Sequence, residues 1–188
     1  MTILIIGLFL FGGCHLFSVL LPPVRNRLKA WLGEAQFKGI YALVSAVGLG
    51  MMFWGYALSR NNGEMLYVPA FAARHITMLL VLVGFICISA AQGKGHIKLW
   101  LQNPFSFGIC LWSIGHLIAN GKTPVVLIYL TFLVIAALDI ISNMVSGNKT
   151  IYEPHLKSDV VAILAGLLIY ALMLFIFHPY VLGVRILG

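Results

Sequence analysis

Long apolar runs separated by short polar connections are the feature that most constrains the fold of this chain. A helix needs about 20 mostly apolar residues to cross roughly 30 Å of hydrocarbon, and six runs reach that length or come close to it. The chain has only 12 Lys/Arg and 5 Asp/Glu among 188 residues, whereas a soluble domain carries about 25% charge. A water-soluble single core is therefore excluded, and a lipid bilayer is the expected partner of the apolar surface. The six runs are residues 3–21, 39–58, 71–91, 104–119, 124–141 and 160–177.

The runs are predicted to be helices, because a segment in hydrocarbon must satisfy its own backbone N–H and C=O groups. The expected fold is an all-α integral membrane protein, a single bundle of six transmembrane helices in one domain over residues 1–188. Asn103 before Pro104 is typical of a helix start. The fourth run is short, so its helix is expected to begin earlier, at residues 99–101. Only residues 120–123 separate the fourth and fifth runs, which predicts a tight antiparallel hairpin.

The distribution of Lys and Arg predicts the orientation of the bundle. The odd-numbered connections hold eight of these residues and the other side holds four. The positive-inside rule then places the first connection, residues 25–38, in the cytoplasm and both termini on the outer side of the membrane. This connection mixes cations with Trp31 and Phe37 and is expected to lie along the anionic inner surface. The cations are scattered over short loops, so the net charge of +7 does not indicate nucleic-acid binding.

Common soluble-enzyme signatures are absent from the sequence. The three cysteines, Cys14, Cys87 and Cys110, lie in three different runs, so neither a disulfide framework nor a zinc cluster is predicted. No nucleotide-binding loop and no Ser/His/Asp signature is present. A small transporter without a cofactor remains one alternative, although no internal repeat or paired intramembrane charge supports it.

Ionisable side chains inside the apolar runs are the main functional signal, because each is costly in hydrocarbon and usually faces a partner, a cavity or a cofactor. They are His15, His75, His116, Asp139 and, at the outer interface, His178. A neutral imidazole tolerates burial better than a charged group and is a common axial ligand of haem iron. Two histidines on different helices are therefore candidates to hold a haem between them. The alternative is that each histidine hydrogen-bonds across helices and only joins them.

Depth in the bilayer ranks these candidates. With a rise of about 1.5 Å per residue, His75 and His116 lie at similar depths near the outer ends of their helices, and His15 lies nearer the cytoplasmic face. Depth alone therefore favours His75 with His116, while helix tilt leaves His15 open. Trp112 shares a helix face with His116, either as the wall of a pocket or as packing against a neighbouring helix. Asp139 is expected to cap or pair near the cytoplasmic end of its run rather than to relay protons.

Several segments resemble a known family of bacterial membrane proteins. They are Gly13-Cys14-His15-Leu16-Phe17, then Arg25, Arg27 and Gly33-Glu34, and finally Leu111-Trp112-Ser113-Ile114-Gly115-His116-Leu117-Ile118-Ala119-Asn120-Gly121. On these residues the chain resembles the NnrU family over nearly its whole length. It is also distantly similar to zeta-carotene isomerase from carotenoid-making organisms. The resemblance implies a multi-pass protein of the bacterial inner membrane, and NnrU itself is associated with denitrification and the handling of nitric oxide.

The resemblance to the isomerase implies haem b as the cofactor. The two axial histidines of that enzyme match His15 and His116, which become the preferred iron ligands and catalytic residues. His75, favoured by depth, is kept in reserve, and Trp112, which shares a helix face with His116, is expected beside the cofactor. One position departs from the relatives, which carry His-Pro where this chain has Asn103-Pro104. Asparagine caps a helix well, so the local structure is expected to survive, and any titrating or ligand-exchange role of a histidine there is lost.

Three functions follow from these expectations. In the first, a haem that releases one histidine on reduction acts as a Lewis acid in the cis-trans isomerisation of an apolar polyene that enters from lipid. In the second, which is not enzymatic, a permanently six-coordinate haem passes electrons, or a redox or nitric oxide signal, to a membrane redox partner. The third is the transporter without a cofactor.

Overall fold

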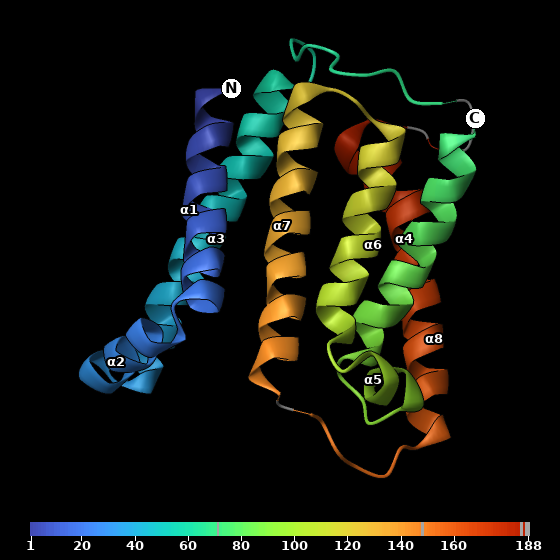
Figure 1. Ribbon diagram of the computed structural model, residues 1–188. Helices are drawn as coiled ribbons and strands as arrows, with labels where there is room; N and C mark the ends of the chain where they lie inside the picture. The colour runs from blue at the N-terminus through green and yellow to red at the C-terminus, as the bar shows by residue number, and fades with distance from the viewer. Residues whose placement is uncertain (71, 148, 185, 187–188) are drawn as a thin grey trace.

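A computed structural model describes residues 1–70, 72–147, 149–184 and 186 of the chain. The described part is helical, apart from turns, loops and one isolated bridge between Met65 and Lys122. Figure 1 shows the helices side by side in one bundle. The elements are α1 (Thr2–Leu20), α2 (Pro22–Leu32), α3 (Glu34–Ser59), α4 (Ala73–Ala90), α5 (His96–Leu101), α6 (Pro104–Ala119), α7 (Thr123–Ser146), α8 (Leu156–Leu172) and η1 (Met173–Leu182), a π-helix that continues α8.

Five of the described helices are long and apolar enough to cross a membrane: α1, α3, α4, α7 and the continuous α8 and η1. The sixth predicted span, α6, is apolar but has only 16 residues. Large apolar side chains are exposed along these helices, among them Phe9 at 76% and Leu79 at 62% exposure. An exposed surface of this kind needs a lipid environment. The chain is therefore an all-helical, multi-pass membrane protein, as predicted; the predicted third run starts at Phe71, which lies outside the described residues.

The predicted start of the fourth helix at residues 99–101 is wrong. Those residues belong to the separate short helix α5, and the chain then breaks at Gln102, whose φ of 59° is left-handed. Asn103 follows as the N-cap of α6, with its side-chain oxygen 3.3 Å from the backbone nitrogen of Ser106, and Pro104 opens the helix. The capping asparagine and the proline begin a new helix more strongly than the apolar residues before them extend it backward.

Two groups of helices pack closely and α7 joins them. Helix α1 packs on α3, and α4 packs on α6 and α8, while α7 contacts both α1 and α6 (Figure 1). Glycines bring these helices together: a Cβ at Gly7 would lie 2.7 Å from the backbone nitrogen of Met52, and one at Gly84 would lie 2.9 Å from the carbonyl oxygen of Gly108. Small residues at such crossings are typical of membrane bundles. The short connection between α6 and α7 also confirms the predicted hairpin.

The two ends of the bundle differ in their polar elements. Helices α2 and α5 lie at the end opposite the start of α1, as Figure 1 shows. Helix α2 carries Arg25, Arg27 and Lys29 beside an exposed Trp31. In the same view the dark red π-helix η1 reaches the end at which α1 starts. The start of α1 and the π-helix η1 therefore lie at the same end of the bundle.

Candidate functional site

His116 lies in the last turn of α6 with one ring nitrogen already bonded. Its Nδ1 is 2.8 Å from the backbone carbonyl oxygen of Trp112, one turn earlier. Because a carbonyl oxygen only accepts, Nδ1 carries the hydrogen, and in the neutral ring the lone pair is on Nε2. The ring also stacks on Tyr129 of α7, with ring centres 4.2 Å apart and planes 13° from parallel. The side chain is thus held in one tautomer and one orientation, the state in which an imidazole binds a metal.

His116 and Trp112 line a cavity of about 520 Å³. Its walls come from α3, α4, α6, α7, α8 and η1 and are mainly aromatic and aliphatic. The polar side chains in this lining are few and include Arg74, Thr77 and Tyr56. The size and the apolar lining are those of a typical small-molecule site. Both alternatives for Trp112 hold: it lines this cavity, and its ring also packs against Tyr129 and Phe132 of α7. Its contact with a cofactor stays a prediction.

His178 is the second histidine of the cavity. It lies in η1, and its Nδ1 is 2.7 Å from the backbone carbonyl oxygen of Met173. Its ring centre is 6.3 Å from that of His116, and the two planes are 15° from parallel. The structure therefore brings together two imidazoles that each use Nδ1 for a backbone hydrogen bond. The sequence had placed His178 only at the outer interface.

His15, the preferred partner of His116, lies outside the cavity lining. It is half-buried in α1, where its Nδ1 shares a hydrogen bond of 2.9 Å with the hydroxyl of Tyr41. A row of three aromatic rings separates it from His116. These rings are Phe11, Phe132 and Trp112, with successive ring centres from His15 to His116 at 4.4, 5.1, 5.4 and 5.1 Å. The structure does not bring His15 and His116 together, and their joint ligation of iron stays a prediction.

His75, the reserve ligand, is exposed near the start of α4. Its neighbours Arg74 and Thr77 line the cavity, and His75 does not. Among the described residues no group of three or more His, Cys, Asp or Glu side chains is arranged to hold a metal ion.

Asp139 closes a polar network at the opposite end of α6. Its Oδ2 accepts hydrogen bonds from the side-chain amide of Asn103 and from the hydroxyl of Ser106, both 2.6 Å long. Asp139 thus bonds to neighbouring side chains, as expected of a residue that caps or pairs, and its placement near the cytoplasmic side stays a prediction. Asn103, which stands where the relatives are expected to have histidine, uses its oxygen to cap α6 and its nitrogen to bind Asp139. This residue joins α6 to α7 and takes no part in the cavity lining.

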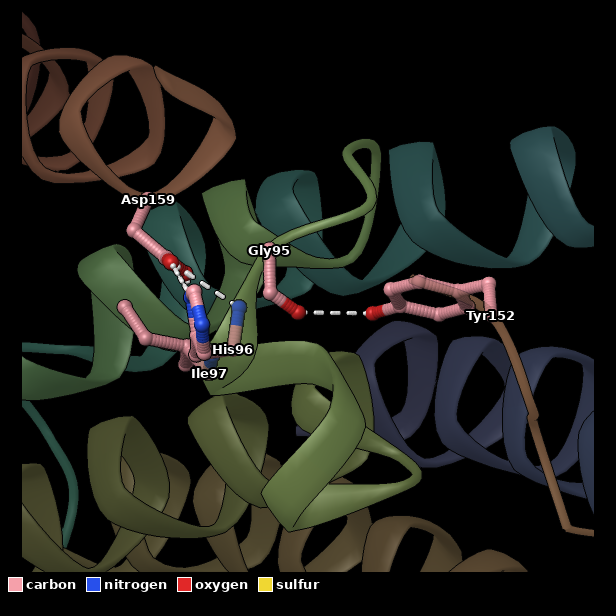
Figure 2. A network of polar contacts seen from close by, with 5 residues as sticks. All are labelled: Gly95, His96, Ile97, Tyr152 and Asp159. Atoms are coloured by element: carbon pink, nitrogen blue, oxygen red, sulfur yellow. Dashed lines mark hydrogen bonds and ion pairs between the residues drawn. The ribbon is translucent and has the colours of Figure 1, made fainter. Parts of the chain in front are cut away.

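Asp159 is a buried carboxylate to which the sequence analysis assigned no partner. It accepts hydrogen bonds from the backbone nitrogens of His96 and Ile97, at 2.9 and 3.0 Å, and from the Nδ1 of His96 at 2.7 Å. Beside it the hydroxyl of Tyr152 donates to the carbonyl oxygen of Gly95 over 2.7 Å. Figure 2 shows how these contacts tie the start of α5 to the start of α8. Their role is to cap α5 and to fix it on the bundle.

The family model described as NnrU protein matches residues 3–186, nearly the whole chain. The chain belongs to the NnrU family. No curated protein and no solved structure matches it, so the similarity of this NnrU family member to zeta-carotene isomerase stays a prediction.

Proposed function

We propose that this NnrU family member binds haem b in the cavity between α3, α4, α6, α7, α8 and η1, with His116 as a ligand of the iron. The observation that carries the proposal is the imidazole of His116. Its Nδ1 is bonded to a backbone carbonyl, its Nε2 is left as a metal-binding nitrogen, and its ring lines the cavity.

The residues present fit a haem. The volume of about 520 Å³ falls within the range of about 300 to 1,000 Å³ for cofactor and ligand sites. Trp112, Tyr129 and Phe132 give the lining the aromatic character that suits an apolar macrocycle. Arg74 supplies a cation in the lining, and a guanidinium is a good partner for the carboxylates that haem b carries. Iron in such a site would supply either one-electron chemistry or a Lewis acid.

The chain is proposed to cross the bilayer six times, with α6 as the short span. Sixteen residues reach about 24 Å at 1.5 Å per residue, which is less than the roughly 30 Å of an average hydrocarbon core. A short helix is accommodated by local thinning of the bilayer. Six crossings return the chain to the side of the membrane on which it starts. This agrees with the start of α1 and η1 lying at the same end of the bundle. Together with the Lys/Arg distribution, this supports termini in the periplasm and a bacterial inner-membrane location.

A second function, the isomerisation of an apolar polyene, is favoured by the side of the cavity that faces lipid. Helix α3 lines one wall and α4 and η1 line another. Within the described residues, however, the backbone of α3 lies close to α1, α2 and α7 and not to α4, α8 or η1; its C-cap Arg60 reaches η1 through a hydrogen bond of 2.6 Å to the carbonyl oxygen of Leu182. A lipid-soluble substrate could therefore reach the cavity between these helices without crossing water. The lining residues would hold the polyene and keep water away, while the haem would supply the electrophile.

The haem proposal is tested by the absorption spectrum and a pyridine haemochrome assay of the purified protein. We expect a b-type spectrum in the wild type and its loss, or conversion to a high-spin form, in His116→Ala. The matched control is His155→Ala, which removes an exposed loop histidine and should leave the spectrum unchanged. Colourless wild-type protein from cells well supplied with haem would contradict the proposal.

Binding of carbon monoxide distinguishes a haem that catalyses isomerisation from a haem that only transfers electrons. If one histidine leaves the reduced iron, as catalysis on the metal requires, adding the gas to reduced protein should shift the spectrum at once. If both histidines stay bound, as suits electron transfer, the spectrum should not move. The second result would exclude isomerisation at the iron and leave haem binding intact.

A further inference from the structure

We propose that His178 is the second imidazole of this site and faces His116 across the bound metal. The inference rests on the proposed haem binding and goes beyond it, because it assigns the second ligand to a histidine of η1 rather than to one of α1. It also disagrees with the ligand pair that the family resemblance implies, namely His15 with His116.

The separation of the two rings carries the inference. A transition metal lies about 2 Å from the imidazole nitrogen that binds it, so two imidazoles on opposite sides of one ion have ring centres about 6 Å apart. The ring centres of His116 and His178 are 6.3 Å apart. Both rings line the same cavity.

The hydrogen bonds of both rings select the same nitrogen. His178 donates from Nδ1 to the carbonyl oxygen of Met173, as His116 does to that of Trp112. In each ring Nε2 is then the nitrogen with the lone pair. A hydrogen bond from the other ring nitrogen is the usual way in which proteins orient a metal-binding histidine. The two residues, from segments about 60 positions apart, share this arrangement.

The backbone around His178 is unusual in a way that supports a binding role. The chain changes from α-helix to π-helix at Met173, and Pro179 lies inside the π-helical segment. The carbonyl that His178 binds lies five residues earlier. A π-helical segment is rare and is frequently found at functional sites, and irregular backbone at membrane depth is tolerated where it lines a cavity. Here the irregular turns present His178 to the cavity.

The other candidates are worse placed. His15 is bonded to Tyr41, and three aromatic rings separate it from His116. His75 is exposed and does not line the cavity. Both residues lie outside the cavity lining, whereas His178 lines it with its ring centre 6.3 Å from that of His116.

The test is the spin state of the haem in single-histidine variants, read by absorption and electron paramagnetic resonance of the ferric protein. In His178→Ala we expect the low-spin signal to be lost and a high-spin signal to replace it, with haem still bound through His116. Added free imidazole should restore the low-spin signal by filling the space of the missing side chain. His15→Ala and His75→Ala should keep the low-spin signal and serve as matched controls.

Each outcome decides the inference. A low-spin signal that survives in His178→Ala and disappears in His15→Ala would overturn it while leaving haem binding in place. Absence of haem from the wild type as well would instead overturn the proposed function. If His178→Ala fails to fold, His178→Gln retains a polar side chain of similar size, and a low-spin spectrum in that variant would also overturn the assignment.

Discussion

The two ends of the bundle use their polar side chains in opposite ways. At the α5 end, the oxygens of Asp139 and Asp159 accept hydrogen bonds from neighbouring helices. At the cavity end, His116 and His178 each use one ring nitrogen in a backbone hydrogen bond and direct their rings into a cavity. Polar groups that satisfy one another hold helices together, whereas a group with a binding atom left over is suited to a ligand.

The comparison predicts that substitutions at the α5 end lower the stability of the protein and do not change its haem binding. The largest effect is expected for Asp159→Ala, which removes the acceptor of two backbone N–H groups and of the His96 ring. Each unsatisfied donor costs about 1 to 3 kcal/mol, so we expect a loss of about 3 kcal/mol in the free energy of unfolding. Denaturant unfolding in detergent measures this loss. Glu153→Ala, at an exposed position in the preceding loop, should change stability by less than about 0.5 kcal/mol.

A smaller loss of stability is expected for Asp139→Ala. This change leaves the amide of Asn103 and the hydroxyl of Ser106 without their acceptor, at a cost of about 2 kcal/mol. The haem content per protein, measured by the haemochrome assay, should stay at the wild-type value. A large fall in haem content with unchanged stability would contradict this difference between the α5 end and the cavity end, because it would give Asp139 a role in ligand binding.

The smallest effect is expected for Tyr129→Phe at the cavity end. The substitution keeps the aromatic ring that stacks on His116 and removes only the hydroxyl. Stability should change by less than about 0.5 kcal/mol, and the spectrum should remain that of the wild type. Tyr129→Ala removes the stacked ring as well and should weaken haem retention. Equal spectra in both variants would show that stacking does not orient His116.

The sequence predicted the features that depend on one segment. The hydropathy of each run indicates a membrane helix because a helix satisfies its own backbone in lipid. The capping role of Asn103 and the hairpin at residues 120–123 follow from side-chain and turn chemistry within a few residues. The separation of α5 from α6 was missed, although both its signals, Asn103 and Pro104, were visible. The apolar residues before them belong to the short helix α5 and do not extend α6.

The sequence could not indicate which histidines face one another. That choice depends on the rotation of each helix about its axis and on the change to a π-helix at Met173, which turns His178 toward His116. Likewise, nothing local to Asp159 indicates that it caps α5, because its partners lie more than 60 positions away in the chain. Composition and local hydrogen bonding fixed the membrane environment and most helix ends, since these act within single segments. Packing between distant helices decided the site, because only packing sets which side chains share a cavity.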